Sequence, residues 1–352
     1  MDNLQYQEGR TELDALGQYA LVERLTDGFE SKNRSTVRAA GDDCAVIRME
    51  GKAESFLLTT IQTLAEGIDF DMMYTPLKHL GYKAVAVALS NIAAMNGTPR
   101  QIEVSLAVSN RYSLEALEEL YAGIRLCCDR YDVDLAGGSI GSSRSGMVIT
   151  VSAIGEVAEG CITYRSGAKL HDLICVSGDL GSAYSGLLIL EREKVTYQAN
   201  PDFQPDLDSY DYVLERYLKP EPRMDIVKAL AEKGVVPTSM IDVGDGLASE
   251  LLHLCRLSKC GCEVYEERIP IDYQTTRVCS EMNKNMLPIS NALNGGGDYE
   301  LLFTIDQKDY DKVKDMEGVH IIGHITEEGA PAVMVTPQNS TITLVAQGFR
   351  GD

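Results

Sequence analysis

The chain has 352 residues, of which 44% are hydrophobic and 24% are charged. These proportions are ordinary for a globular protein and exclude disorder and collagen-like folds, and the length predicts two domains of roughly 100 to 200 residues each. With 53 acidic against 32 basic residues, the net charge of −21 repels phosphate backbones and anionic lipid headgroups, so neither nucleic acid nor a membrane surface is expected as a partner.

The first part of the chain predicts a layered α/β unit. Helical spacing of apolar residues predicts an amphipathic helix from Thr11 to about Leu25. Two stronger helix patterns begin at Pro76 and after Ser113. Segments rich in Val, Ile, Leu and Thr predict strands at residues 44–49, 55–60, 102–108 and 147–154. Short strands interleaved with helices favour a compact layer structure.

A second unit is predicted to begin near Tyr164. The same patterns predict strands at residues 173–177, 240–243, 262–265, 301–305, 320–325 and 332–336. They predict helices through residues 187–190, 248–257 and 309–316, and a polar connection at 198–208. We therefore predict an α/β (α+β) fold with two domains, residues 1–160 and 161–352.

Cysteine use and the N-terminal sequence bear on the compartment. The chain has no apolar stretch of about 18 residues, and its start lacks the basic and then apolar pattern of a signal peptide, so a cytoplasmic protein is expected. Nine scattered cysteines, an odd number, favour reduced thiols. The densest group, Cys255 with Cys260 and Cys262, lacks the second pair or the histidines of a zinc site.

Four segments join glycine to acidic or hydroxyl residues near predicted strand ends. They are Gly41-Asp42-Asp43, Gly137-Gly138-Ser139, residues 242–246 and residues 295–300. Glycine lets backbone N–H groups approach a phosphate, and carboxylates hold the Mg²⁺ that neutralises it. Any one of them could be an ordinary turn, but four together favour nucleotide phosphate chemistry. The chain has neither a G-x-x-x-x-G-K-[ST] motif nor a strict G-x-G-x-x-G after a strand, so a Walker-type NTPase is excluded.

Six ordered motifs carry a family resemblance. They are Gly41-Asp42-Asp43-Cys44-Ala45-Val46, Leu80-Gly81-Tyr82-Lys83-Ala84-Val85-Ala86-Val87, Ala93-Ala94-Met95, Tyr164-Arg165-Ser166-Gly167-Ala168, Ile241-Asp242-Val243 with Asp245-Gly246-Leu247, and Asp298-Tyr299-Glu300-Leu301 with Phe303-Thr304. Through them nearly the whole chain resembles the thiamine-monophosphate kinases. The resemblance implies a fold shared with aminoimidazole ribonucleotide synthetase, in which an N-terminal α/β domain forms a homodimer through its sheet. It also implies a small-molecule substrate and two cofactors: ATP phosphorylates thiamine phosphate to thiamine diphosphate around Mg²⁺ ions.

The resemblance assigns roles by position. The implied catalytic and metal-binding acids are Asp43, Asp242 and Asp245. Thr60 falls where the family has a small hydroxyl residue and is assigned to the metal site. The expected nucleotide contacts are Tyr131, Gly137, Gly138 and Arg165. A half-buried tyrosine at a helix end is an equally good interpretation of Tyr131. Asp69 and Asp298 are assigned to the substrate side.

Six positions depart from the family motifs. An Asp is replaced by Gln62, Asn91 and Ser139, a His by Asp69, a Ser by Gly244 and a Glu by Gly297. Three metal carboxylates and two substrate-side groups are thus predicted to be absent. Because phosphoryl transfer depends on cations that neutralise the phosphate oxygens, each loss can lower the rate by roughly 10² to 10³.

Two functional hypotheses follow. The chain is either a weakly active kinase acting on thiamine phosphate or a related small phosphate, or a silent paralogue that binds nucleotide or thiamine phosphate as a regulator or partner subunit. The substitutions at Gln62, Asn91 and Ser139 separate the two. A purely structural role is disfavoured, because the acids at 43, 242 and 245 and Arg165 remain.

Overall fold

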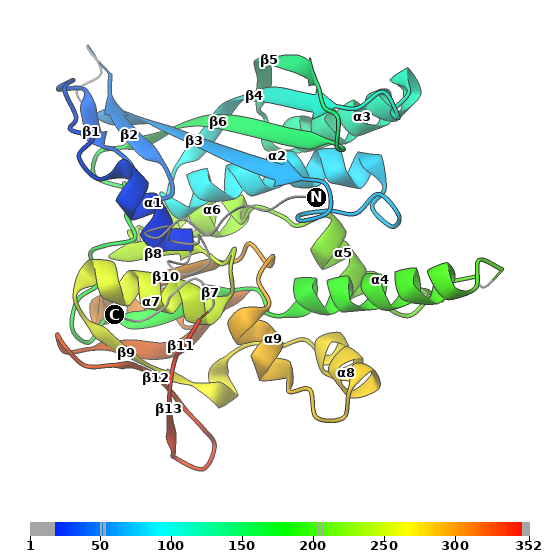
Figure 1. The fold of residues 1–352 in the computed structure, drawn as a ribbon. Helices are drawn as coiled ribbons and strands as arrows, with labels where there is room; N and C mark the ends of the chain where they lie inside the picture. Colours follow the sequence, from blue (N-terminus) through cyan, green and yellow to red (C-terminus); the bar gives the residue numbers. More distant parts are fainter. Residues whose placement is uncertain (1–17, 50, 52–53, 203, 206, 347–352) are drawn as a thin grey trace, which may run out of the picture.

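The computed structural model describes residues 18–346 apart from residues 50, 52–53, 203 and 206. The helix predicted from Thr11 is seen as α1 (Gln18–Thr26), and its first part lies outside the described residues. Two sheets follow, each with its own helices (Figure 1). They divide the chain between Ala158 and Leu173. The predicted domain boundary at residue 160 falls in this interval and stays a prediction.

The first sheet has six strands in the order β1-β2-β3-β6-β4-β5. Their bounds are β1 Thr36–Arg38, β2 Ala45–Arg48, β3 Ser55–Ala65, β4 Thr98–Val108, β5 Asp134–Ser142 and β6 Val148–Ala158. Helices α2 (Leu77–Ala94) and α3 (Leu114–Tyr131) lie beneath it in Figure 1, with α2 in contact with β3, β4 and β6. Among the described strands of this sheet, only β4 and β5 pair in parallel, and α3 is the crossover that connects them.

Glycine allows α2 and α3 to pack at backbone distance. A Cβ atom on Gly81 would stand 2.0 Å from the Leu120 carbonyl oxygen, and one on Gly123 would stand 1.8 Å from the Lys78 carbonyl oxygen. Residues 80–94 of α2 are all buried, because the sheet covers one side of the helix and the second half of the chain covers the other. The long helix predicted from Pro76 is thus the central layer of the molecule.

One prediction for this sheet was wrong. The segment Gly137-Gly138-Ser139 was expected to be a turn, but it lies inside β5, the outer strand. Gly138 is needed there because its φ is +154° and a Cβ atom would stand 2.0 Å from the Val104 carbonyl oxygen of the neighbouring strand. All nine residues of β5 are exposed, so the strand has no alternating burial for the sequence to report.

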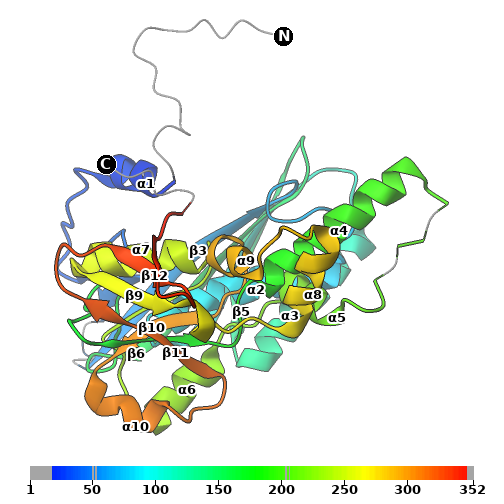
Figure 2. The same cartoon turned by 90° about the horizontal axis from the view of Figure 1, so that it is seen from below.

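The second sheet has seven strands in the order β13-β12-β9-β11-β7-β10-β8. Their bounds are β7 Leu173–Ser177, β8 Ser239–Asp242, β9 Gly261–Tyr265, β10 Leu301–Ile305, β11 Val319–Thr326, β12 Ala332–Val335 and β13 Thr341–Thr343. The helices of this half are α4 Ser182–Ala199, α5 Asp211–Leu218, α6 Met224–Glu232, α7 Leu247–Ser258, α8 Tyr273–Met282, α9 Pro288–Asn294 and the short α10 Tyr310–Val313. Figure 2 shows α4 and α8 side by side at one end of the sheet and α7 over its other end.

A continuous apolar core joins the two halves. Ala93 and Ala94 at the end of α2 pack in one buried cluster with Met240 of β8 and with Leu301 and Phe303 of β10. Helix α2 also contacts α5 and α6. Burial of this kind holds the two sheets in a fixed arrangement, so side chains from both halves keep their places where the halves meet.

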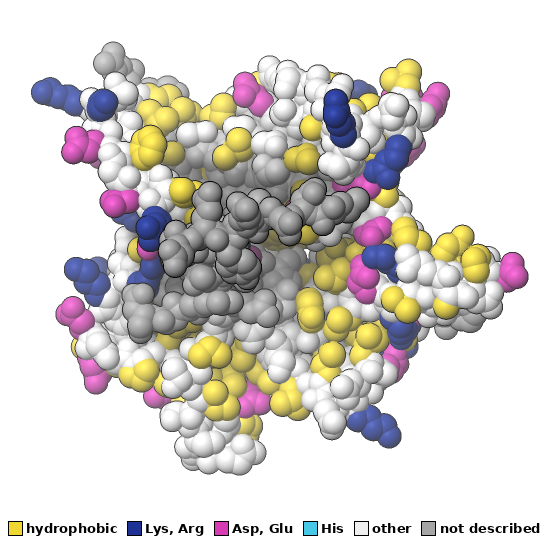
Figure 3. Space-filling view, viewed as in Figure 1, with side chains coloured by type: hydrophobic (Ala, Val, Ile, Leu, Met, Phe, Trp, Pro, Cys, Tyr) yellow, Lys and Arg dark blue, Asp and Glu magenta, His cyan; other side chains and the backbone are white. Residues whose placement is uncertain are grey.

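The surface and the helices agree with the composition. In the part of the surface that Figure 3 colours, basic side chains stand singly or in small groups among acidic ones. Among the described residues, no helix is long and apolar enough to cross a membrane. All nine cysteines are free thiols, as predicted.

Candidate active site between the two halves

A cluster of four acids forms where the halves meet. Asp43 lies in the loop before β2, Asp242 ends β8, Asp245 follows in the next loop, and Glu250 lies in the first turn of α7. Asp43, Asp242 and Glu250 are buried. The backbone N–H of Asp245 donates to Glu250 Oε1 at 3.0 Å, which ties the loop to the helix. We call these four residues the acid cluster.

The acids of the cluster oppose one another's ionisation. Burial, followed by the charge of Asp43, raises the pKa of Asp242 to about 7. Burial, followed by the charge of Asp245, raises the pKa of Glu250 well above its usual range. Neighbouring Asp42 has its pKa raised to about 6 by burial and by Asp43. A bound cation would relieve this repulsion, as it does wherever like charges share a site.

Arg165 is the cation that reaches into the cluster. Its guanidinium pairs with Asp43 Oδ1 at 2.5 Å, and its backbone N–H donates to Asp42 Oδ1 at 3.1 Å. The other oxygen of Asp43, Oδ2, is buried and has no hydrogen-bond partner among the described residues. A buried carboxylate oxygen without a partner is unfavourable unless a ligand completes it.

These donors fit Mg²⁺ in the way that enzymes of phosphate chemistry bind it. Among the described residues, no three or more His, Cys, Asp or Glu side chains are arranged to hold a metal ion by themselves. Mg²⁺, however, commonly takes one or two carboxylates and fills its other positions with water and substrate phosphates. The free oxygen of Asp43 and the carboxylate of Asp242 match that requirement.

Substituted motif positions lie beside the cluster. Asn91, near the end of α2, is buried and donates through Nδ2 to Thr60 Oγ1 at 2.8 Å. Thr60 and Gln62 lie on the same face of β3 as buried Leu58, the face that α2 covers. A neutral amide bonded to a hydroxyl therefore occupies the place for which the resemblance implies a carboxylate and its metal.

Tyr299 connects the cluster to a second polar group. It has a φ of +52°, which is rare for a bulky residue, and its backbone N–H donates to the Val243 carbonyl at 2.9 Å. Burial, followed by the charges of Asp242 and Asp245, raises the pKa of its hydroxyl, and Asp69 adds to the effect. A strained aromatic residue held between two polar groups is typical of a ligand site.

Lys83 lies on the Asp69 side of Tyr299. It is 7% exposed, and its Nζ stands 4.0 Å from the ring centre of Tyr217. Burial lowers its pKa to about 8, which the charge of Asp69 partly opposes. Asp69 itself accepts from the Ala65 backbone N–H at 2.7 Å and so closes its own turn. The predicted substrate residue is thus placed beside a buried lysine.

Comparison with known proteins now places the chain. The family model described as AIR synthase related protein, N-terminal domain, matches residues 41–157, and the corresponding C-terminal domain model matches residues 171–336. Thiamine-monophosphate kinase of Bacillus subtilis is 30% identical over 88% of this chain and 91% of its own, and that of Aquifex aeolicus is 31% identical over 90% and 97%. The chain belongs to the thiamine-monophosphate kinase family. The solved structure of AaThiL complexed with AMPPCP and TMP has a TM-score of 0.78 at 26% identity and covers 95% of this chain and 97% of that one.

The predicted nucleotide-binding residues of β5 lie apart from the acid cluster. Ser139 Oγ lies 2.9 Å from Ser105 Oγ, and Gly137 and Gly138 flank it on β5. Strand β5 lies three strands from β3, or about 14 Å at the usual strand spacing. Within one chain, these residues are therefore separated from Thr60 and the acid cluster, and their expected role in nucleotide binding stays a prediction.

Tyr131 has a partner of its own. Its hydroxyl donates to Glu221, which also accepts from the Tyr82 hydroxyl at 2.6 Å and pairs with Arg130 at 3.2 Å. This group connects α2 and α3 to the chain between α5 and α6. Tyr131 also lines a cavity of about 1230 Å³ beside α6. The structure thus supports its interpretation as a helix-end tyrosine, and nucleotide contact stays a prediction.

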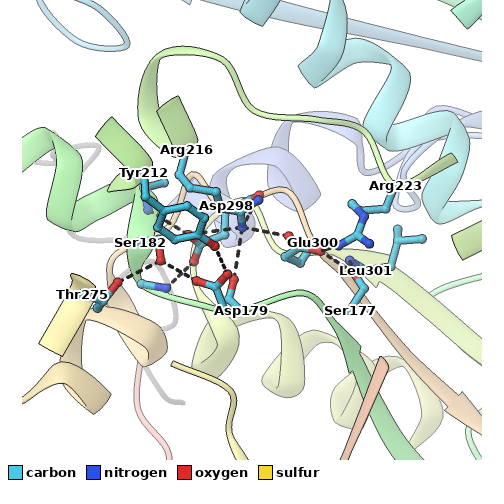
Figure 4. Close-up of polar contacts among 12 residues, drawn as sticks. Ser177, Asp179, Ser182, Tyr212, Arg216, Arg223, Thr275, Asp298, Glu300 and Leu301 are labelled. Carbon is cyan, nitrogen blue, oxygen red and sulfur yellow. Dashed lines mark hydrogen bonds and ion pairs between the residues drawn. The ribbon is translucent and has the colours of Figure 1, made fainter. Parts of the chain in front are cut away.

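Asp298 lies in a second group of buried acids, shown in Figure 4. It accepts from the Gly181 and Ala183 backbone N–H groups at 2.7 and 3.0 Å, at the start of α4. Its neighbour Glu300 pairs with Arg216 and Arg223 and accepts from Ser177 Oγ. We call Asp298, Glu300, Arg216 and Arg223 the arginine network. Both oxygens of Asp298 are used within the fold, and its predicted substrate role remains a prediction.

Sequence reasoning missed two residues of the site. Glu250 stands five residues after Asp245 in the first turn of a helix, where an acid is usually interpreted as favourable to the helix dipole. Tyr19 of α1 donates its hydroxyl to Asp245 across 226 positions of sequence. An acid three residues after the Asp-Gly-Leu motif was a signal for the first, and the sequence held none for the second. The substituted positions Gly244 and Gly297 contact each other: the Gly297 backbone N–H donates to the Gly244 carbonyl oxygen at 2.7 Å.

Proposed function

We propose that the chain binds Mg·ATP at the acid cluster and phosphorylates thiamine phosphate to thiamine diphosphate, more slowly than its motif-complete relatives. The observation that carries the proposal is the buried Oδ2 of Asp43, which has no hydrogen-bond partner among the described residues and lies beside Asp242, whose pKa is raised by burial and by the charge of Asp43. The names of the relatives supply the substrate and the reaction. The carboxylates of the acid cluster indicate that a cation binds there.

Each part of the site has a role in this proposal. Asp43 and Asp242 would hold Mg²⁺, which when bound neutralises phosphate oxygens and orients them for transfer. Arg165 pairs with Asp43, and its guanidinium can also bind a phosphate that reaches the acid cluster. Asp69 and Lys83 lie near Tyr299 and Tyr217, and the thiamine phosphate is proposed to bind on this side of the acid cluster.

The slow rate has a local cause. Asn91 and Thr60 are joined by a hydrogen bond of 2.8 Å. Both side chains are neutral, so neither offers negative charge to a second cation. Gln62 on the same strand face is also neutral. Because metal-binding groups in phosphoryl transfer act as a unit, loss of part of the set is expected to reduce the rate by several orders of magnitude.

The second candidate function is a silent paralogue that binds nucleotide or thiamine phosphate. The Asn91–Thr60 bond favours it, because this contact stabilises the fold without needing a ligand. Binding without turnover would distinguish it from the first. Both candidates require the acid cluster.

A homodimer through the first sheet is also proposed. Strands β3 and β4 are interior to this sheet, and its edges are β1 and β5. Support comes from large apolar side chains on the sheet surface: Ile61, Leu135 and Ile140 are 67%, 48% and 62% exposed. Light scattering should give the mass of two chains at micromolar concentration, and a monomer would contradict the proposal.

The decisive assay measures thiamine diphosphate formed from thiamine phosphate and Mg·ATP. The wild type is expected to turn over well below the roughly 1 to 100 per second of ordinary kinases. A combined Gln62→Asp, Asn91→Asp, Ser139→Asp and Asp69→His variant should be much faster than any single change, and Asp43→Asn with Asp242→Asn should abolish product. Binding of Mg·AMPPCP without product in the wild type would establish the silent alternative, and absence of both would overturn the proposal.

A further inference from the structure

Helix α1 lies against α7 and contacts the acid cluster directly. The Tyr19 hydroxyl donates to Asp245 Oδ2 and stands 3.1 Å from Ser249 Oγ. The Tyr19 ring meets the His253 ring edge-on, with 4.1 Å between centres. Four residues further along α1, Glu23 pairs with Arg256. Figures 1 and 2 both show α1 beside α7.

The Tyr19 contact occupies one oxygen of Asp245, an acid that the resemblance assigns to the metal site. Asp245 is the cluster acid whose carboxylate accepts from a hydroxyl delivered by a separate, distant helix. A cation or a metal-bound water that takes Oδ2 of Asp245 must compete with the Tyr19 hydroxyl that donates to the same oxygen. Binding through Oδ2 of Asp245 therefore weakens the contact by which Tyr19 ties α1 to the acid cluster.

The rest of α1 is weakly attached. It has nine residues, and the side chains of Val22 and Leu25 are 48% and 66% exposed. A short helix with few buried apolar contacts opens at a small free-energy cost. Polar contacts of Tyr19 with Ser249 and of Glu23 with Arg256 contribute to holding α1 on α7.

We propose that α1 is a strap whose Tyr19 shields Asp245, and that a divalent cation with its nucleotide competes with this contact and releases the helix. This rests on the proposed function, because it assumes that the acid cluster is the cation site. It adds a positioning residue, Tyr19, that acts on the site through Asp245. It also predicts that α1 responds to the ligand while the arginine network does not.

The test uses the full chain with Mg·AMPPCP and compares three proteins by calorimetry. Tyr19→Phe keeps the ring on His253 and removes the hydroxyl, and affinity is expected to rise by roughly 10-fold, the effect of one hydrogen bond to a charged group. Tyr212→Phe is the matched control, because the Tyr212 hydroxyl also donates to an aspartate, Asp179, outside the acid cluster. Its affinity should equal that of the wild type.

Hydrogen exchange gives a readout that does not depend on turnover. Residues 18–26 should exchange faster when Mg·AMPPCP is bound, and α4 should not change. Equal or weaker affinity in Tyr19→Phe, or α1 protected further by the ligand, would overturn the strap while leaving the proposed function intact. Absence of Mg·AMPPCP binding in both wild type and Tyr19→Phe would overturn both, whereas binding in Tyr19→Phe alone would support the strap.

Discussion

The two groups of buried acids differ in how far the fold satisfies them. In the arginine network, Glu300 is held by two arginines and a serine, and Asp298 by two backbone N–H groups (Figure 4). In the acid cluster, Arg165 pairs with Asp43, and the other oxygen of Asp43 has no hydrogen-bond partner among the described residues. Residue type is the same in both groups. The two groups differ in whether the carboxylate oxygens have hydrogen-bond or ion-pair partners within the fold. We interpret the group with partners as structural and the group without them as a ligand site.

The difference has an energetic meaning. A buried acid with complete partners stabilises its surroundings, and removal of one partner leaves an uncompensated charge. Buried acids that face one another destabilise the unliganded chain, and a cation reverses this effect. The acid cluster therefore lowers the stability of the unliganded chain, and a cation that binds there restores it.

The largest expected effect follows from opening the arginine network. Glu300→Gln removes the charge between Arg216 and Arg223 and should lower the free energy of unfolding by roughly 3 to 5 kcal/mol. Urea denaturation measures it. Asp242→Asn in the acid cluster is the control, and it should not destabilise the metal-free chain. Equal losses in both variants would contradict the comparison.

The next effect concerns binding. Asp242→Asn should weaken Mg·AMPPCP binding by about 100-fold, because hydrogen bonds and contacts to a charged ligand are among the strongest in a buried site. Calorimetry at fixed Mg²⁺ gives the value. Wild-type affinity in this variant, and in Asp43→Asn, would place the nucleotide elsewhere.

The pH dependence of stability sharpens the comparison further. The pKa of Asp242 is about 7 in the folded chain against an ordinary 3.8, so between these pH values the folded chain binds more protons than the unfolded one. Its contribution is then favourable at low pH and is lost as the pH rises through 7, by roughly 2 to 4 kcal/mol. Thermal or urea unfolding in EDTA at pH 5.5 and 8 should show this loss in wild type and a smaller loss in Asp242→Asn, in which Asp42 and Glu250, whose pKa values are also raised, still respond. A pH response that the substitution leaves unchanged would exclude Asp242 as its source.

The smallest expected effect is that of Tyr131→Phe. Glu221 keeps Tyr82 and Arg130 as partners after the hydroxyl is removed, so the loss of stability should be about 1 kcal/mol. Affinity for Mg·AMPPCP should change less than about 2-fold, because the hydroxyl is directed to Glu221. A fall of 10-fold or more would show that the hydroxyl contacts nucleotide.

Much of the fold was predictable because its signals are local. The alternating burial of β6 and the long apolar pattern of α2 appear in the sequence as periods of two and 3.6 residues. Strand β5 has no such period, since all nine residues are exposed. Helices α5 and α6 were not predicted, because Pro220 and Pro222 between them resemble a loop.

The site was predictable only in part, because satisfaction of polar groups depends on distant residues. Asp298 directly follows Gly297, and Asp43 stands two residues after Gly41, each in a ligand-type motif. Only the positions of Arg216 and of the α4 N-terminus reveal that the first belongs to the fold. Likewise Tyr19 reaches Asp245 through tertiary packing alone.

The most direct measurement is anomalous diffraction from crystals grown with Mn²⁺ and AMPPCP, since Mn²⁺ takes the same oxygen ligands as Mg²⁺. The account predicts a manganese peak bonded to Asp43 and Asp242, with the triphosphate beside it and Tyr19 withdrawn from Asp245. The arginine network should hold no metal. Nucleotide bound with its manganese away from Asp43 and Asp242 would contradict the central claim that the acid cluster is the catalytic metal site.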